Sequence, residues 1–234
     1  MTRRLLLMLL LLASATMQSM AQKVDPKAYY TNKDGAQEGT SIEDGQAPLP
    51  VTFRANPTDL GAWTPSYEWH FIRVSKAEGN QELFVRYEED TDYTFMDSGT
   101  FNVVLKTKLK DDNGNEDALE DATIVVSIAE SKLEFPNAFS PNGDGHNDIY
   151  RAKPDYKSII SFRAIILNRW GQKLYEWKDL DGGWDGKFHG KDVAQGVYYV
   201  LVEAKGGDGK EYNIRKDVNL LRGYTENGNT TGGN

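Results

Sequence analysis

The stretch "SYEWHFIRV" (66–74) determines the fold predicted for the first half of the chain, because it alternates large apolar and polar residues. Tyr67, Trp69 and Phe71 stand two positions apart, and a β-strand points such residues to one face. Three aromatic rings on one face predict a strand that packs against a core. We expect these rings to serve core packing rather than ligand contact.

The same alternation recurs along most of the chain, in stretches rich in β-branched and aromatic residues. Clusters of Gly, Asn, Asp and Pro separate these stretches, as turns do. No stretch has a sustained helical period, so the sequence predicts an all-β protein of two consecutive β-sandwich domains, over 48–130 and 131–222. The expected strands are 51–55, 66–74, 81–87, 100–109, 122–128, 161–168, 172–177, 196–205 and 211–221.

Single residues of the second half carry further expectations. In 196–205, the alternate set Tyr198–Ala204 is expected on the buried face, because the other set ends in the charged Glu203. Trp170 is expected to cover one end of the core, and Trp184 to anchor a loop.

The two ends of the chain differ from its middle. Residues 1–21 begin with Arg3 and Arg4, continue with an apolar run too short to span a bilayer, and end in small residues. This pattern predicts a secretory signal peptide over 1–21. Residues 22–47 are polar with little periodicity and are expected to form a linker. Residues 223–234 are expected to be a disordered tail.

Charge and composition exclude several classes of function. The net charge is −8, and removal of the signal peptide would shift it to −10 by taking away Arg3 and Arg4. A chain this acidic is not expected to bind nucleic acid or anionic lipid. The absence of cysteine excludes disulfides and thiolate metal sites.

No convergent catalytic pattern is present in the sequence. The three histidines, His70, His146 and His189, lie far apart and in no metal-binding spacing. A serine nucleophile elbow and a phosphate-binding Gly-Lys-Ser/Thr loop are also missing. The 35 acidic residues leave a chance carboxylate pair open, but the sequence predicts a protein that is not an enzyme.

The loop "SPNGDGHND" (140–148) has oxygen-bearing residues at alternate positions, as calcium loops do. In that alignment position 1 is Ser140, which lacks a carboxylate, and position 12 is Arg151, which cannot bind a cation. One hypothesis is therefore a weak calcium site. The other is a purely structural turn, in which Gly143 and Gly145 adopt positive φ. The candidate calcium ligands are Asn142, Asp144, His146 (through its carbonyl) and Asp148.

The first domain resembles a PKD-like, immunoglobulin-type domain. The resemblance rests on "VTFRANP" (51–57), on the Tyr-x-Trp-x-Phe strand and on "FMDSGTFNVVLKTKL" (95–109). The chain departs from that family after the aromatic strand, where "RVSKAEGN" (73–80) replaces the usual Gly-Asp-Gly turn. The resemblance implies a spacer or an adhesion module, whose ligand would be an unknown protein or glycan. Trp63 of the first domain and Trp177 of the second are candidate exposed aromatics for a sugar or protein ligand.

The second domain resembles the gliding motility-associated C-terminal domain, the type B sorting domain of the type IX secretion system of Bacteroidota. Four stretches carry the resemblance in order: "FPNAFSPNGDGHNDIY" (135–150), "ILNRWGQKLYEW" (166–177), "GGWDGKFHGKDVAQGVYYVLVEA" (182–204) and "NLLR" (219–222). The matching motif residues are Phe135, Pro136, Asn137, Phe139, Pro141, Asn142, Gly143, Asp144, Gly145, Asn147, Asp148, Asn168, Arg169, Trp170, Gly171, Trp184, Asp185, Gly186, Gly196, Tyr198, Tyr199 and Arg222.

This resemblance implies an immunoglobulin-like sandwich that directs an exported protein. The implied partners are the type IX translocon and the outer-membrane surface, and the implied location is that surface or the extracellular space. The twelve residues after Arg222 depart from the family, which usually stops close to this arginine. Two hypotheses follow: a sorting signal that is removed near Ser131, or a structural or adhesion protein that retains both domains.

Overall fold

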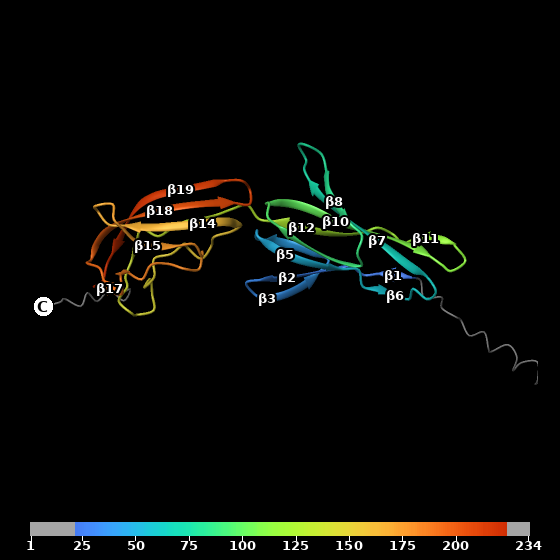
Figure 1. The fold of residues 1–234 in the computed structure, drawn as a ribbon, viewed down its shortest axis with the longest axis horizontal. Helices are drawn as coiled ribbons and strands as arrows, with labels where there is room; N and C mark the ends of the chain where they lie inside the picture. The colour runs from blue at the N-terminus through green and yellow to red at the C-terminus, as the bar shows by residue number, and fades with distance from the viewer. Residues whose placement is uncertain (1–21, 224–234) are drawn as a thin grey trace, which may run out of the picture.

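The computed structural model describes residues 22–223, so the predicted signal peptide and residues 224–234 of the predicted tail lie outside the described part. The described chain forms two β-rich domains that lie end to end (Figure 1). It contains no helix, and no helix within 22–223 is therefore available to cross a membrane. The prediction of an all-β protein with two consecutive immunoglobulin-like sandwich domains is confirmed.

The first domain contains two main sheets and a two-stranded pair of β1 with β6. One sheet has the order β3-β2-β5-β9, and the other has the order β4-β12-β10-β7-β8, with β11 paired to β10. All of these pairs are antiparallel except β4 with β12. The strands are β1 (Lys23–Val24), β2 (Lys27–Asn32), β3 (Gly35–Gly39), β4 (Ser41–Gly45), β5 (Leu49–Arg54), β6 (Pro57–Thr58), β7 (Thr64–Val74), β8 (Gln81–Arg86), β9 (Asp90–Phe95), β10 (Gly99–Lys110), β11 (Glu116–Ala118) and β12 (Ala122–Ile128).

The aromatic face of β7 fills the core between these sheets, as expected. Tyr67, Trp69 and Phe71 are all buried. Phe53 on β5 in the opposite sheet packs edge-on against Phe71, with ring centroids 5.6 Å apart. The indole nitrogen of Trp69 donates a hydrogen bond to the backbone oxygen of Glu88 at 3.1 Å, so its single polar group is satisfied.

The prediction that residues 22–47 form a linker is wrong, because this segment supplies β1 to β4 of the first domain. β2 pairs with β5, and β4 pairs with β12, so both sheets include it. Ala28 and Ile42 are completely buried in the core. The segment looks like a linker because strand pairing uses backbone groups, which composition does not reveal, and because only a few of its side chains face inward.

The second domain is a five-stranded sheet with the order β13-β19-β18-β14-β15, covered on one face by loops and a short hairpin. β18 shows the expected burial, because Tyr198, Val200, Val202 and Ala204 face the core. The strands are β13 (Ala138–Phe139), β14 (Ile159–Leu167), β15 (Lys173–Trp177), β16 (Lys187–Phe188), β17 (Lys191–Asp192), β18 (Gly196–Gly206) and β19 (Glu211–Leu220).

The β18–β19 hairpin turn joins the two domains. The Ser98 N–H donates to the Gly207 oxygen at 2.9 Å, and the Ala47 N–H donates to Ser158 Oγ at 3.2 Å. A Cβ on Gly207 would lie 2.9 Å from the backbone oxygen of Met96, so glycine is needed for this approach. Lys157 Nζ and Asp44 Oδ1 form an ion pair at 2.8 Å beside the turn.

The connecting segment between the domains is also bonded on both sides. The Ala129 N–H donates to the Gly45 oxygen at 2.8 Å, and Ser98 Oγ donates to the Ala129 oxygen at 2.7 Å. The Ser131 N–H donates to Asp208 Oδ2 at 3.1 Å in the second domain. Residues 129–131 are therefore held in place rather than forming a loose tether.

Candidate functional site

The loop over 140–148 wraps its backbone N–H groups around the carboxylate of Asp148. Asp148 Oδ1 accepts from the N–H groups of Asn142 at 2.9 Å and Gly143 at 2.7 Å, and Oδ2 accepts from Gly145 at 2.8 Å. Gly143 and Gly145 have φ of 81° and 84°, which turns their N–H groups inward. The hydrogen bonds from Gly143 and Gly145 hold the pKa of Asp148 below its usual range.

The second carboxylate of the loop is also used within the loop. Asp144 Oδ1 accepts from the His146 N–H at 2.8 Å, and Oδ2 accepts from the Asn142 side-chain amide at 2.9 Å. Within residues 22–223, no group of three or more His, Asp or Glu side chains is placed to hold a metal ion. The loop points N–H donors at its own carboxylates, and this polarity favours the structural-turn hypothesis over a calcium site.

Four aromatic motif rings and the ring of Tyr150 form one cluster beneath this loop. The Trp184 ring lies 5.3 Å from Phe139 and 5.1 Å from Tyr198, measured between centroids. Tyr150 packs on Phe135 at 5.8 Å and on Phe139 at 5.7 Å. Trp184 is completely buried, and its indole N–H donates to the Lys187 oxygen at 2.8 Å, so its expected role as a loop anchor is confirmed.

Arg222 ties three of the four motif stretches together. Its guanidinium donates from Nε to the Val193 oxygen at 3.1 Å, from Nη1 to Pro141 at 3.2 Å and from Nη2 to Gly186 at 2.7 Å. These acceptors lie 29, 81 and 36 residues away in the chain. The planar fork of arginine suits such a multiple contact, which lysine would not reproduce.

Asn168 organises the turn between β14 and β15. Its Oδ1 accepts from the N–H groups of Trp170 and Gln172, both at 3.0 Å, and Gly171 has a φ of 80°. The expectation that Trp170 covers the core is wrong, because its side chain is 75% exposed. The turn needs only the backbone of this residue, so the indole is free to point outward, where Arg169 lies over it at 4.3 Å.

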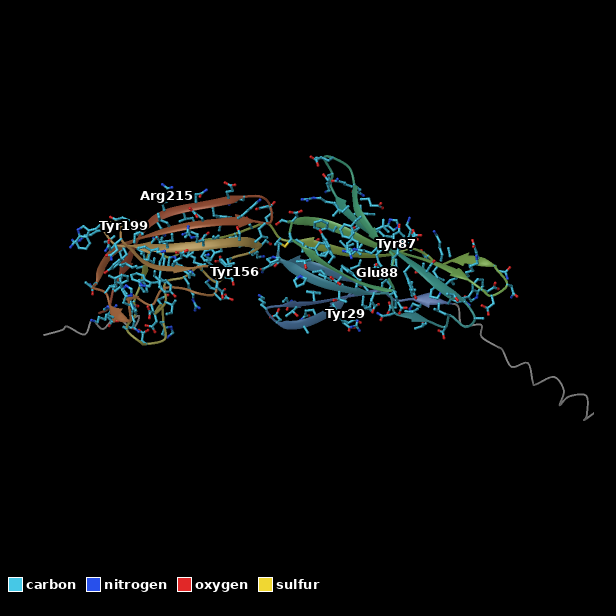
Figure 2. All side chains as sticks on the ribbon, viewed as in Figure 1. Tyr29, Tyr87, Glu88, Tyr156, Tyr199 and Arg215 are labelled. Atoms are coloured by element: carbon cyan, nitrogen blue, oxygen red, sulfur yellow. The ribbon has the colours of Figure 1, made fainter. Side chains whose placement is uncertain are left out.

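The adjacent tyrosines of β18 point to opposite faces. The Tyr198 hydroxyl donates to the Ala194 oxygen at 2.7 Å, and burial raises the pKa of Tyr198. Tyr199 is 45% exposed on the outer face of the sheet. Figure 2 labels Tyr199 on this face, toward the end of the domain that lies away from the first domain. One motif pair therefore contains one core residue and one surface residue.

Further motif residues hold backbone segments in place through hydrogen bonds or through a positive φ. Pro136 accepts the Tyr150 hydroxyl at 3.1 Å, and the Asn137 oxygen accepts the Asn219 N–H at 2.9 Å. Asp185 Oδ1 accepts the Lys187 N–H at 3.1 Å, which closes the turn at Gly186. Asn147 has a φ of 52° and its oxygen accepts from Ser140, and Gly196 begins β18 with a φ of 150°.

Two residues outside the predicted set also hold the site. A Cβ on Gly183 would lie 2.5 Å from Ile149 Cγ2 and 2.6 Å from the Tyr150 oxygen, so this glycine permits the strand bridge of Tyr150 with Trp184. Lys216 Nζ donates to the Phe135 oxygen at 3.1 Å and to the side chain of Asn137. The Gly-Gly pair could have drawn attention to Gly183, but no sequence signal marks Lys216.

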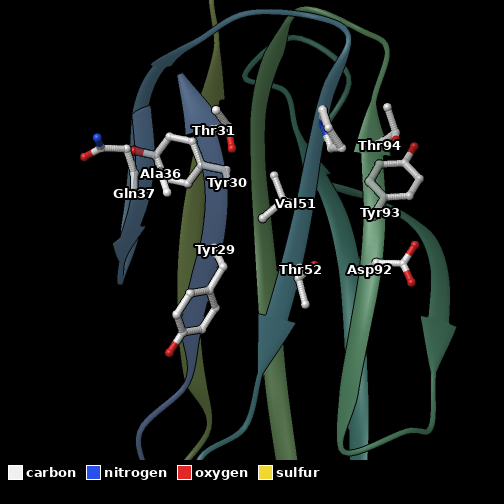
Figure 3. Close-up of a pocket in the computed structure, with 11 residues that line it drawn as sticks. Tyr29, Tyr30, Thr31, Ala36, Gln37, Val51, Thr52, Asp92, Tyr93 and Thr94 are labelled. Carbon is white, nitrogen blue, oxygen red and sulfur yellow. The ribbon is translucent and has the colours of Figure 1, made fainter. Parts of the chain in front are cut away.

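Neither of the two tryptophans expected to be exposed for a ligand is fully exposed. Trp177 is buried at 7% exposure in the second domain, so the expectation that it is an exposed aromatic is wrong, and Trp63 is half-buried. A groove of the first domain runs across β2, β5 and β9 (Figure 3). Tyr29, Thr52 and Asp92 lie side by side in it, because they are directly opposite one another on these neighbouring strands. The volume of the groove is about 550 Å³.

The histidines do not converge on one site. His70 lies on β7 of the first domain, and its ring nitrogens contact Glu82 at 2.7 Å and Glu68 at 3.4 Å. His146 and His189 lie in loops of the second domain. Two carboxylates of the first domain therefore flank His70, and the three histidines lie on separate elements of two domains.

The geometry defines a β-domain whose sequence motifs converge on one buried cluster. Residues 133–216 match the CHU_C type IX secretion signal domain. The predicted resemblance of the second domain is thereby confirmed, and the chain carries a type IX secretion signal domain. Such a domain implies interaction with the secretion machinery and export to the cell surface or the extracellular space. No curated protein sequence matches the chain.

Solved structures give only a weak likeness. The fibronectin(III)-like modules of Clostridium thermocellum CbhA are 15% identical over 79% of this chain and 89% of theirs, with a TM-score of 0.22. Chicken CNTN1 FN1-FN3 domains are 11% identical over 79% of this chain and 66% of theirs, with a TM-score of 0.25. Latent PorU from Porphyromonas gingivalis is 11% identical over 88% of this chain and 20% of the PorU chain, with a TM-score of 0.27. These TM-scores are too low to transfer any property.

Proposed function

We propose that this protein is a non-catalytic exported protein whose second domain is the sorting and surface-attachment signal of type IX secretion. The match of residues 133–216 to the secretion signal domain supports this proposal. The convergence of the motif residues on one cluster agrees with a folded signal, in which the machinery reads a shape rather than a linear peptide. The first domain, over about residues 22–130, is the cargo, a PKD-like spacer or binding module. The groove beside Tyr29 is the place where a protein or glycan ligand would bind it.

Deletion of residues 131–234 tests the sorting role. The chain is expressed in a bacterium with an active type IX system, and the protein is quantified in the periplasm and outside the cell. We expect the full chain outside the cell and the truncated chain in the periplasm. Export of a folded, truncated chain at the level of the full chain would refute the proposal.

Retention of the second domain after export is the second candidate, and the domain junction favours it. The backbone of Ala129 and Ser131 is bonded to both domains, whereas a protease needs an extended, accessible segment. The intact mass of the protein from the cell surface decides between the two outcomes. A species that still contains residue 222 supports retention, and a species that ends near residue 130 supports a removed signal.

A further inference from the structure

Two large motif side chains of the second domain lie outside its hydrophobic core. The other aromatic motif residues, such as Trp184 and Phe139, are buried in the core cluster. Trp170 and Tyr199 are instead 75% and 45% exposed. The turn at Trp170 is built by Asn168 and Gly171 and does not use the indole. Exposed side chains of this size stabilise little, so a contact outside the fold is the simplest use for them.

These side chains belong to one surface strip. Leu167 on β14 lies directly opposite Tyr199 on β18, and Ile165 lies opposite Leu201 in the same register. Val197, two positions before Tyr199, extends the same face and is 48% exposed. Trp170 stands in the turn that follows Leu167, at the end of this row. We call these residues the outer strip; its members are Ile165, Leu167, Trp170, Val197, Tyr199 and Leu201.

The outer strip carries unpaired positive charge, although the chain is acidic. Arg169 lies over the Trp170 ring, and Arg215 on β19 lies opposite Leu201. Within residues 22–223, neither guanidinium forms an ion pair with a carboxylate within 4.0 Å. Arg163 nearby, in contrast, is paired with Glu176 at 2.8 Å. Figure 2 labels Arg215 beside Tyr199, on the same side of the domain. One carboxylate, Asp217, faces Tyr199.

The geometry points to the outer strip as the surface by which the type IX export machinery binds this domain. This inference rests on the proposed sorting function. The partner surface would be a protein with an apolar slot for Trp170 and Tyr199, bordered by carboxylates that meet Arg169 and Arg215. Tyr199 of the strip lies toward the end of the second domain away from the first domain, where the cargo does not obstruct it (Figure 2).

Two other occupants fit the charges less well. In a symmetric pair of this chain, the same patch meets itself, so the unpaired cations of both copies would come close together. An anionic membrane would attract these two cations but repel a chain whose net charge is −8. A protein with acidic residues around an apolar slot matches both the rings and the charges.

Export of the full-length chain from a host with an active type IX system tests the inference. The test variants are Trp170→Ser with Tyr199→Ser, and separately Arg169→Glu with Arg215→Glu. The matched control is Tyr87→Ser, because Tyr87 is 72% exposed but lies in the first domain. We expect about a tenfold or greater loss of export for both test variants, as for residues at the centre of an interface, with accumulation in the periplasm. The control is expected to be exported like the unchanged chain.

Three measurements on the purified proteins make the outcome decisive. The melting temperatures of both test variants are expected to stay close to that of the unchanged chain, because no residue of the core cluster is changed. If both variants fold and are exported normally while deletion of 131–234 blocks export, the surface inference is wrong and the sorting function stands. If the deletion also leaves export intact, the sorting function itself is wrong. A dimer of the unchanged chain that Trp170→Ser disperses, or binding to anionic vesicles that it abolishes, would overturn the inference in favour of those occupants.

Discussion

Arg222 is the residue whose replacement we expect to loosen the motif cluster most clearly without opening the hydrophobic core. The Arg222→Ala variant removes three donors that reach Val193, Pro141 and Gly186. A hydrogen bond from a charged donor contributes about 1.5 kcal/mol at the lower end of its range, so three contribute about 4.5 kcal/mol. The side chain of Arg222 is 25% exposed, so water can reach part of the vacated space and satisfy some of the carbonyls. We therefore expect a loss of about 2–3 kcal/mol in the free energy of unfolding of the second domain.

Urea denaturation of residues 22–234, followed by tryptophan fluorescence, measures this loss. Since the two domains are expected to unfold in separate steps, the transition of the second domain is the one to compare. Arg222→Lys is expected to recover less than half of the loss, because an ammonium reaches one carbonyl rather than three. Arg215→Ala is the control, with an expected change below about 0.5 kcal/mol for an unpaired surface arginine. A change for Arg222→Ala no larger than that of the control would show that the three carbonyls do not depend on this side chain.

Further predictions concern the loop, the junction and calcium. The N–H groups of Gly143 and Gly145 lower the pKa of Asp148 in the folded state. The stabilisation of the fold by this carboxylate is therefore complete above its unfolded pKa of about 4, and it is lost as the pH falls through the folded pKa. Acid unfolding curves of the unchanged chain and of Asp148→Asn are therefore expected to differ most near neutral pH and to converge in strong acid; parallel curves would contradict the assignment. The Gly207→Val variant is expected to separate the domains, because its Cβ would lie 2.9 Å from the Met96 oxygen. Limited proteolysis is then expected to cut the segment 129–132 faster than in the unchanged chain and in a Lys210→Ala control, and equal rates would mean that the junction does not protect this segment. Calcium at about 1 mM is expected to leave the melting temperature of the second domain unchanged, since the carboxylates of the loop are already bonded within it; a rise would instead support the calcium hypothesis.

The sequence predicted the parts of the fold that depend on alternation. Trp69 and its neighbours on β7, and the buried set of β18 around Val200, needed only the two-residue repeat of a strand to be placed. It failed for β2 and β4, where few side chains face inward and Ala28 is the one fully buried side chain of its strand. It also failed for Trp170 and Trp177, because hydrophobicity alone does not say whether a ring meets a core or solvent.

The sequence by itself determined the strand pattern, the all-β class and, through the order of its four motif stretches, the identity of the second domain as a secretion signal domain. Only the tertiary structure decided what each motif residue does. It showed that Arg222 joins stretches up to 81 residues apart, that Asp148 is enclosed by N–H groups, and that Trp170 and Tyr199 are left on the surface. The physical reason is that periodicity is a local property of a chain, whereas burial and hydrogen-bond partners depend on which distant segments pack together.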